Sequence, residues 1–359
     1  MKILILSGML EYRGVGLYTL YLAEELKKRG HNLQVITAGG KLVDELKSRK
    51  IQVKEYPSLL KPVDGLFFCG EFVKELNNNY PDIIHMHFSH NRLDHLAGSL
   101  AQRMKRPYLM TIPNIQLLTH KLKINKKWIK NIIVTTESAR EHLVNYFKTP
   151  KELIEVIYAG IDSSRIKPVE LPKEKNGKRI IGIIGPLEKW RGHQYFLEAG
   201  KWLVENNYDV QFLIIGEGSL EDELRRQVVK MGLQKKVVFI PSMDSYYQVL
   251  PMVDIFVFPI SRMGVGITLL EAMALAKPVI VSGISDIYTL VKDGETGYYI
   301  PVDNADAIRE KIIHVINTPE EALKIGQQAR IFVQENFTSQ KMAGRTIEFY
   351  EKALEKVNV

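Results

Sequence analysis

The chain has 359 residues, of which 45% are hydrophobic and 25% charged, with a formal net charge of +8. This composition is ordinary for a globular protein, and the length favours two domains over a single core. Cys69 is the only cysteine, so an internal disulfide framework is excluded. No apolar run approaches the roughly 18 residues of a membrane span, and "MKILILSG" is too short for a signal peptide, which predicts a cytoplasmic protein.

In the first half of the chain, short apolar, β-branched runs alternate with helical patterns. Strands are predicted at 2–7, 32–37, 81–87, 106–112, 130–137 and 154–162. Amphipathic helices are predicted at 16–30 and 137–147. This alternation is typical of βαβ units built on a parallel sheet.

Residues 163–178 interrupt the alternation with two prolines and dense charge, which predicts a linker. The pattern then restarts, with strands predicted at 179–185, 209–216, 236–240, 254–259 and 278–282. Helices are predicted at 191–206, 219–231, 245–252, 266–276 and 339–357. The predicted architecture is α/β, with two doubly wound, Rossmann-like domains facing a central cleft. Their boundaries are 1–165 with the C-terminal helix at about 340–359, and 175–338.

The positive charge is confined to the first half of the chain. Residues 1–170 hold 26 Lys and Arg against 17 Asp and Glu, whereas the remainder is nearly neutral. The segment 120–130, "HKLKINKKWIK", places Trp128 among five lysines. This pattern indicates either docking on anionic lipid headgroups or an ordinary solvated basic surface.

In the second domain, two loops that follow strands carry residues suited to a phosphate ligand. "GPLEKWRGH" brings Lys189, Arg191 and Gly192 to a strand-to-helix junction, where cations and free backbone N–H groups attract a diphosphate. "IIGEGSLEDEL" places Gly216 and Gly218 before a helix for which Ser219 is a plausible N-cap. Those two glycines fit close approach of a ligand and a tight turn equally well.

A third loop of this domain leads into the predicted helix 266–276. Gly264 and Gly266 lie at its N-terminus, where unpaired amides and the helix dipole attract phosphate. Glu271 follows about one turn later, in an otherwise apolar helix. A buried carboxylate requires a partner, and we consider nucleotide ribose hydroxyls and a buried cation as the two alternatives.

In the first domain, Gly14 and Gly16 open a helix after the first strand. The strand "DIIHMHFSH" then brings His85, His87 and His90 toward its carboxyl end, where a histidine can hydrogen-bond a sugar. The H-x-H-x-x-H spacing also suggests a metal site.

The metal alternative is disfavoured by the residues around the histidines. A binuclear metallohydrolase motif needs an aspartate where Ser89 stands, and no second set of histidines and aspartates follows at suitable spacing. We therefore expect no metal.

The arrangement resembles the retaining glycosyltransferases of family 4, or group 1, which have the GT-B fold. The similarity covers nearly the whole chain and includes "LAEELKKRGHNLQVIT", "VTTESAREHL", "IIGEGSLEDEL", "LLEAMALAKPVIVS" and "LVKDGETGYYIPVDNADAI". It implies a nucleotide-sugar donor in the second domain and an acceptor on the first.

The resemblance also implies roles for individual residues. Glu271 matches the family's second glutamate, which holds the ribose, and Arg191 with Gly192 matches the Lys-Gly of the phosphate loop. Gly14 matches a first-domain glycine near the donor phosphate. His87 is the best match to the histidine near the reacting sugar, with His85 as the less favoured choice.

The sequence departs from the family pattern at several positions. Met263 stands where the first of the paired glutamates is expected, and a thioether is a poor hydrogen-bond acceptor. Pro186 replaces the arginine of the usual G-R-L, for which Lys189 is a candidate substitute, and Arg13 replaces a glycine. Ala159 stands for the usual asparagine of the V-I-x-N-G-V-D element.

These features predict a metal-independent retaining glycosyltransferase that needs no cofactor. The donor is expected to be a UDP-sugar, or a GDP-sugar as the second choice, and the acceptor a glycan or lipid-linked sugar in bacterial surface polysaccharide or glycolipid synthesis. The protein is expected in the cytoplasm, with peripheral attachment to the inner face of the membrane left open, and without nucleic-acid binding.

Two alternatives stay open. One is a catalytically impaired protein that binds a nucleotide, a sugar or a partner protein, and the other is a GT-B epimerase or phosphorylase. A dinucleotide dehydrogenase is disfavoured, because no G-x-G-x-x-G follows the first strand of either domain.

Overall fold

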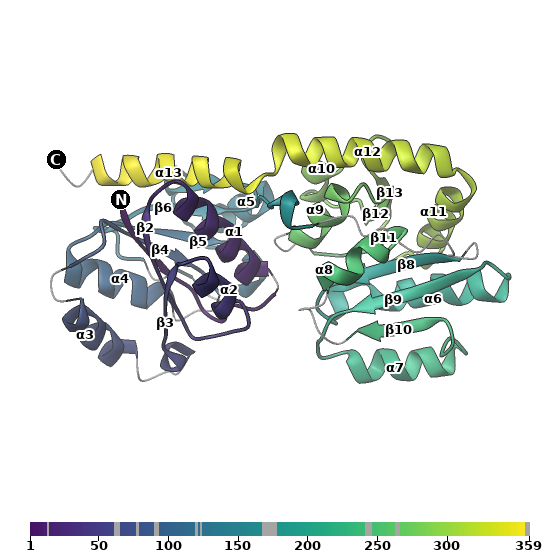
Figure 1. Cartoon of the computed structure of the whole chain (residues 1–359), viewed down its shortest axis with the longest axis horizontal. Helices are drawn as coiled ribbons and strands as arrows, with labels where there is room; N and C mark the ends of the chain where they lie inside the picture. Colours follow the sequence, from purple (N-terminus) through teal and green to yellow (C-terminus); the bar gives the residue numbers. More distant parts are fainter. Residues whose placement is uncertain are drawn as a thin grey trace. The chain divides into compact units, whose positions relative to one another are not determined.

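The computed structural model describes residues 1–12, 14–60, 65–76, 79–89, 93–118, 121–122, 124–166, 178–240, 246–262 and 266–355. The chain divides into two compact units (Figure 1). Unit 1 comprises Met1–Ile161 and Thr338–Val359, and unit 2 comprises Asp162–Phe337. The last segment of the chain therefore returns to the unit that contains its beginning.

Unit 1 is built on a seven-stranded parallel sheet with the order β3-β2-β1-β4-β5-β6-β7. The strands are β1 (Lys2–Leu6), β2 (Asn32–Thr37), β3 (Gln52–Glu55), β4 (Ile83–His87), β5 (Tyr108–Ile112), β6 (Ile129–Val134) and β7 (Ile154–Val156). The helices are α1 (Gly14–Lys28), α2 (Val43–Ser48), α3 (Gly65–Glu75), α4 (Leu93–Met104), α5 (Glu137–Asn145) and α13 (Ser339–Glu355).

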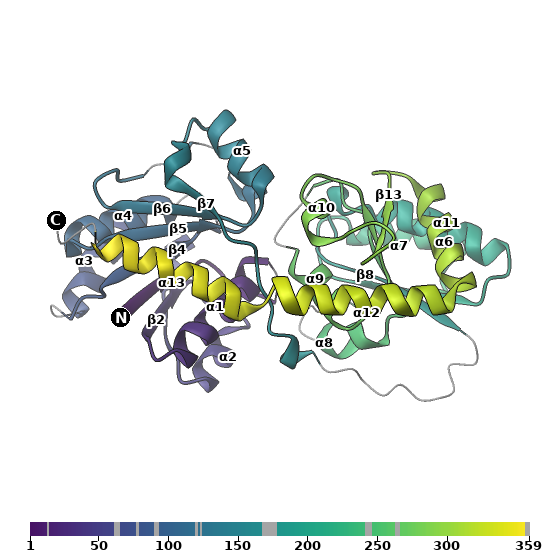
Figure 2. The ribbon, with the colours of Figure 1, turned by 90° about the horizontal axis from the view of Figure 1, so that it is seen from above.

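The central strands of unit 1 are buried on both faces because helices cover both. Residues of α3, α4 and α5 form one core with alternate residues of the sheet, including Ile84 and Met86 of β4. The C-terminal helix α13 packs along α1 and contacts β6 (Figures 1 and 2). The order of the strands reverses between β1 and β4.

Unit 2 is built on a six-stranded parallel sheet with the order β10-β9-β8-β11-β12-β13. The strands are β8 (Arg179–Ile184), β9 (Val210–Ile215), β10 (Val237–Ile240), β11 (Ile255–Phe258), β12 (Val279–Ser282) and β13 (Tyr298–Ile300). The helices are α6 (His193–Glu205), α7 (Glu221–Lys230), α8 (Tyr246–Val249), α9 (Ile267–Ala274), α10 (Ile287–Leu290), α11 (Ala305–Asn317) and α12 (Pro319–Asn336).

The predicted fold class, two doubly wound parallel α/β sheets, is confirmed. Of the predicted linker, residues 163–165 form a 3₁₀ turn, and 167–177 lie outside the described residues. The prediction of Ser219 as an N-cap is wrong, because α7 begins at Glu221 and the Ser219 hydroxyl donates to Glu188 Oε2 at 3.0 Å. Across the described ranges, no helix is both long and apolar enough to cross a membrane.

Candidate functional site

In unit 2, strand order reverses between β8 and β11, and ligands of doubly wound sheets bind beyond the carboxyl ends of strands at such a point. The loop after β8 leads into α6, and the loop after β11 leads into α9. These are the two loops in which the sequence predicts phosphate-binding residues.

Arg191 is the central side chain of the loop after β8, and it is buried rather than displayed on the surface. Its Nη2 donates to the carbonyl oxygen of Ile184 at 2.8 Å, and its guanidinium carbon lies 4.8 Å from the Phe258 ring centroid. Burial lowers the pKa of Arg191 to about 10, so the group is still cationic at neutral pH. A fixed cation therefore lies at the switch point.

Gly185 makes room for this guanidinium. Its φ is +148°, and a Cβ there would lie 1.6 Å from Arg191 Nη2. The position therefore requires glycine for both its backbone conformation and its lack of a side chain.

The loops after β8 and β11 are held together by backbone contacts. The amide of Ser261 donates to the carbonyl of Trp190 at 2.9 Å. A Cβ on Gly192 would lie 2.1 Å from the carbonyl oxygen of Pro259. Gly192, which the sequence predicts to face a phosphate, is thus also required for close contact between the two loops.

The helices that leave these loops both begin without a side-chain cap. Gly192 precedes α6 with φ +74°, and Gly266 precedes α9 with φ +75°, and neither can cap the helix with a side chain. By contrast, Thr136 caps α5 and Asn304 caps α11. Uncapped N-terminal amides and the positive end of the helix dipole attract anions, and the N-terminus of α6 directly follows the buried cation Arg191.

The other predicted residues of this region differ in exposure. Glu271 is completely buried in α9. Lys189 is exposed in the 3₁₀ turn before α6. Gly264 and Met263 lie outside the described residues.

Gly216 and Gly218 allow two backbones to approach each other. A Cβ on Gly216 would lie 2.0 Å from the Gly185 carbonyl oxygen, and one on Gly218 would lie 2.5 Å from that of Leu187. The amide of Leu187 donates to the Glu217 carbonyl at 3.0 Å, extending the pairing of β8 with β9 beyond the sheet. The sequence leaves open whether these glycines face a ligand or form a tight turn. The contacts in the structure are with neighbouring backbone, which supports a tight turn.

Sequence reasoning missed His193, the first residue of α6. Its side chain is 2% exposed, and neither ring nitrogen has a hydrogen-bond partner within the described part of the chain. Burial and the neighbouring charge of Arg191 lower the pKa of His193 to about 3, so the ring is neutral. His193 lies on the same face of α6 as the apolar Phe196 and Leu197, and this helical spacing is the sequence signal that indicates its burial.

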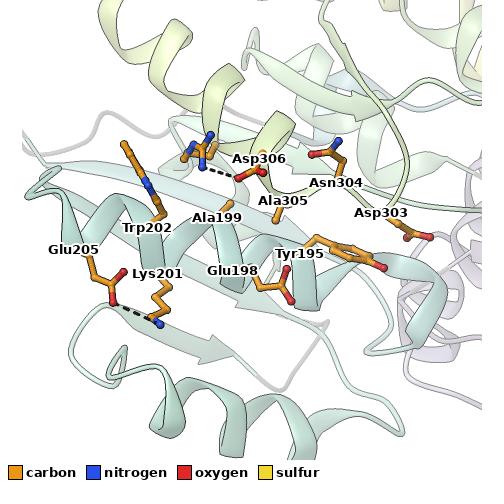
Figure 3. A pocket seen from close by; sticks show the side chains of 11 residues that line it. Tyr195, Glu198, Ala199, Lys201, Trp202, Glu205, Asp303, Asn304, Ala305 and Asp306 are labelled. Carbon is orange, nitrogen blue, oxygen red and sulfur yellow. Dashed lines mark hydrogen bonds and ion pairs between the residues drawn. The ribbon is translucent and has the colours of Figure 1, made fainter.

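A surface pocket of about 450 Å³ lies between α6 and α11 and contains none of the predicted site residues (Figure 3). Trp202 and Tyr195 stand along α6, and Asp303 and Asp306 come from the other side. Two ion pairs of its lining lie within single helices, Lys201 with Glu205 at 3.6 Å and Arg309 with Asp306 at 2.6 Å. The residues that line the pocket are therefore different from those of the loops at the β8–β11 switch point.

In unit 1, Gly14 is the first residue of α1, with φ +34°. Gly16 is the more constrained glycine, because a Cβ there would lie 2.0 Å from the carbonyl oxygen of Glu11. The loop before α1 therefore packs directly on the helix. Arg13 lies outside the described residues.

His85 and His87 are both fully buried on one face of β4, as the two-residue period of a strand dictates. His85 Nδ1 lies 2.6 Å from the Tyr350 hydroxyl of α13, and Nε2 lies 2.6 Å from Thr111 Oγ1. Both ring nitrogens of His85 therefore have hydrogen-bond partners within unit 1. His90, the third histidine of the predicted triplet, lies outside the described residues.

The hydrogen bonds of Thr19 define the tautomer of His87. Thr19 Oγ1 donates to the Val15 carbonyl at 2.8 Å, so at 2.7 Å it accepts from Nδ1–H of His87. Nε2 then carries the lone pair, and it has no partner among the described residues. Burial lowers the pKa of His87 to about 3, so this side chain is a neutral acceptor.

Comparison with known proteins gives matches over both units. Residues 12–165 match the family described as Glycosyltransferase Family 4, and residues 167–332 match Glycosyl transferases group 1. The chain is 25% identical over 375 residues to an uncharacterized glycosyltransferase of Methanocaldococcus jannaschii, covering 95% of each chain. It is 23% identical to N-acetyl-alpha-D-glucosaminyl L-malate synthase of Bacillus anthracis, covering 95% of this chain and 94% of the other.

Among solved structures, the fold is similar to that of Anabaena Alr3699/HepE in complex with UDP-glucose. The TM-score is 0.84 at 16% identity, with 98% of this chain and 100% of the other covered. Both units thus match glycosyltransferase families in sequence, and the whole chain is similar in fold to this structure. The chain belongs to the group 1, or family 4, glycosyltransferases with the GT-B fold.

Proposed function

We propose that this protein transfers a sugar, with retention of configuration, from a nucleotide-diphosphate-sugar to a glycan or lipid-linked acceptor. A UDP-sugar is the first choice of donor and a GDP-sugar the second. The observation that carries the proposal is the buried Arg191 at the β8–β11 switch point, directly before the uncapped N-terminus of α6. The loop after β11 leads to a second uncapped N-terminus, that of α9. The Anabaena relative in complex with UDP-glucose supports the choice of donor.

In this proposal, fixed charges of unit 2 stabilise the leaving diphosphate. The amides of α6 and α9 and the guanidinium of Arg191 are held in place before the donor binds, so they need little rearrangement as charge develops. Lys189, exposed on the same loop, adds a mobile cation. These groups supply the stabilisation that a metal ion supplies in other transferases, so we propose that transfer needs no metal.

Glu271 is proposed to hold the ribose. A carboxylate accepts hydrogen bonds from two neighbouring hydroxyls, and charge-assisted bonds are the stronger kind. The family resemblance assigns no protein nucleophile to retention, so Glu271 is a binding group here. For unit 1, the lone pair of His87 Nε2 is proposed to accept a hydrogen bond from an acceptor hydroxyl. This requires the buried ring to become accessible when the acceptor binds.

A catalytically impaired protein is the second candidate. The observation in its favour is Pro186, half-buried where the family places a cation. This leaves Arg191 as the buried cation of the loop, with one of its donors already used by Ile184. Both candidate functions include binding of the donor, but only the first includes transfer of the sugar to an acceptor.

The experiment that separates them is a transfer assay with labelled UDP-glucose, UDP-N-acetylglucosamine and GDP-mannose. The protein is incubated with a bacterial lipid extract and EDTA, and label is followed into lipid and glycan fractions. The enzyme transfers label from one donor, and at donor concentrations below saturation Glu271→Gln reduces the transfer about tenfold. Donor binding without transfer to any acceptor favours the second candidate.

A further inference from the structure

The side chains of β4 divide between the two faces of the unit 1 sheet. Ile84 and Met86 belong to the core formed with α3, α4 and α5. His85 and His87 lie on the opposite face, against α13 and α1, because successive residues of a strand alternate between faces. Both histidines are completely buried, so each of their ring nitrogens needs a hydrogen-bond partner.

The imidazole of His87 is enclosed on this face by Tyr18 and Thr19 of α1 and by His85. Its Nδ1–H donates to Thr19 Oγ1 at 2.7 Å, and the Tyr18 ring lies at 82° to it, with 5.4 Å between the ring centroids. The His85 ring lies at 89°, with 4.5 Å between the centroids. The remaining polar atom of the His87 ring, Nε2, has no partner among the described residues. Such a buried lone pair requires an explanation, and a hydrogen-bond donor on a ligand is one.

His85 is close enough to His87 to supply that missing partner, but its own hydrogen bonds prevent this. Burial, and then the interaction with His87, hold the pKa of His85 well below its ordinary value, so the ring is neutral and has one N–H and one lone pair. Nδ1 of His85 lies 2.6 Å from the Tyr350 hydroxyl, and Nε2 lies 2.6 Å from Thr111 Oγ1. The single N–H is therefore engaged by one of these two hydroxyls and is not available to His87.

Tyr350 is the partner of His85 that comes from α13. It is 265 residues from His85 in the sequence, its side chain is completely buried, and its ring packs edge-on against the imidazole with 5.5 Å between the centroids. The Thr111 hydroxyl can donate or accept, so it pairs with either tautomer of His85. When the Tyr350 hydroxyl is removed, Nδ1–H of His85 is free to turn to the lone pair of His87 Nε2, the neighbouring unsatisfied acceptor.

We propose that Tyr350 and His85 are positioning residues for the transfer reaction. The Tyr350 hydroxyl holds His85 in an orientation in which it does not donate to His87, so His87 Nε2 is kept available for a hydroxyl of the acceptor. Their role rests on the proposed function, in which His87 accepts that hydrogen bond. The last helix of the chain thereby affects the chemistry of unit 1, although Tyr350 acts only through His85.

NMR spectra of the histidine ring nitrogens test the effect on His87 without any substrate. Nitrogen chemical shifts distinguish a ring nitrogen with a free lone pair from one that accepts a hydrogen bond, and His87→Gln assigns the His87 signals. We expect a free Nε2 in the wild-type protein and in Tyr108→Phe, and a hydrogen-bonded Nε2 in Tyr350→Phe. Tyr108→Phe is the matched control, because Tyr108 is equally buried in unit 1 and its hydroxyl also makes a hydrogen bond, with the Asn125 amide at 3.0 Å.

A double variant separates positioning from simple loss of stability. Tyr350→Phe should lower the transfer rate at saturating donor about tenfold and leave the affinity for UDP unchanged, because UDP is proposed to bind in unit 2. His85→Phe with Tyr350→Phe removes the competing N–H together with its partner, and should restore transfer to within about threefold of the wild type. A role confined to stability predicts instead that the double variant is at least as impaired as Tyr350→Phe. Urea denaturation shows that each variant is folded under the assay conditions.

These outcomes differ from those expected if the proposed function fails. The same Nε2 signal in Tyr350→Phe and Tyr108→Phe overturns the inference, and so does a double variant whose transfer is not restored. A hydrogen-bonded Nε2 in Tyr350→Phe with unchanged transfer overturns the role of His87 in transfer. Absence of UDP binding in the wild-type protein defeats the proposed donor site and leaves the NMR comparison unaffected.

Discussion

The guanidinium of Arg191 occupies the space beside Gly185 that any other side chain would need. A Cβ on Gly185 would lie 1.6 Å from Arg191 Nη2, and the guanidinium is held there by the Ile184 carbonyl and the Phe258 ring. The absence of a side chain at Gly185 therefore leaves the space in which the guanidinium of Arg191 is held. The proposed donor site depends on this pair.

Gly185→Ala is therefore expected to displace Arg191. The φ of +148° adds backbone strain, so the free energy of unfolding should fall by roughly 1–3 kcal/mol. Affinity for UDP should fall at least about tenfold, equivalent to about 1.4 kcal/mol. Gly232→Ala is the matched control, because Gly232 has φ +72° but a Cβ there would meet no atom within 4 Å. Titration calorimetry and urea denaturation measure both effects, and equal results for the two variants would contradict the role of Gly185.

Glu271→Gln is expected to weaken binding of UDP about tenfold and leave binding of pyrophosphate unchanged. The amide removes the charge that strengthens hydrogen bonds to ribose hydroxyls, which is worth about 1–2 kcal/mol. Pyrophosphate lacks the ribose and reports on Arg191 and the helix amides alone. Competition binding measures both ligands. An equal loss for both would show that Glu271 acts through the packing of α9 instead.

The buried histidines predict how stability depends on pH. Burial lowers the pKa of His87 and of His193 to about 3, below the value of about 6.5 in an unfolded chain. Full stability is therefore present above pH 6.5 and is lost as the pH falls toward 3, because the unfolded chain takes up protons that the folded chain does not. Each such histidine contributes a slope of about 1.4 kcal/mol per pH unit below pH 6.

Denaturation at pH 6.0, 5.5 and 5.0 measures this slope before most carboxylates titrate. His193→Gln should reduce the slope by about 1.4 kcal/mol per pH unit, since one proton fewer is taken up on unfolding. An unchanged slope would mean that His193 is protonated normally in the folded protein.

Tyr350→Phe tests how α13 is attached to unit 1. The substitution removes the hydroxyl that lies 2.6 Å from His85 Nδ1 and leaves that nitrogen buried without a partner, at a cost of about 1–3 kcal/mol. Thr111→Val removes the partner of the other nitrogen. In a double-mutant cycle the two effects should be non-additive, because both act on one imidazole. Additive effects, or no loss for Tyr350→Phe, would contradict the network.

Long apolar strands and amphipathic helices are predictable because their signal is local. The apolar runs of β1 and β8 predict these strands directly. The sequence of β3, QVKE, is polar, and β13 has three residues, so neither gives a pattern from which a strand can be predicted. The helices α11 and α12 have clear amphipathic spacing, but sequence reasoning missed them.

Details of the candidate site depend on partners far away in the sequence. Phe258, which covers Arg191, and Tyr350, which binds His85, belong to distant segments, so no local pattern predicts that these side chains are buried. Gly216 likewise fits a ligand-facing glycine and a turn glycine equally well in sequence, and only the position of the Gly185 carbonyl shows the close backbone contact.

The measurement that tests the central claim most directly is titration calorimetry of UDP and GDP, in EDTA, into the wild-type protein and Arg191→Ala. Lys230→Ala, at an exposed position of α7, controls for the loss of a positive charge. The account predicts that one nucleotide binds without metal, that Arg191→Ala weakens it at least about tenfold, and that Lys230→Ala does not. Equal affinity for wild type and Arg191→Ala, or no binding of either nucleotide, would contradict a donor site at the β8–β11 switch point.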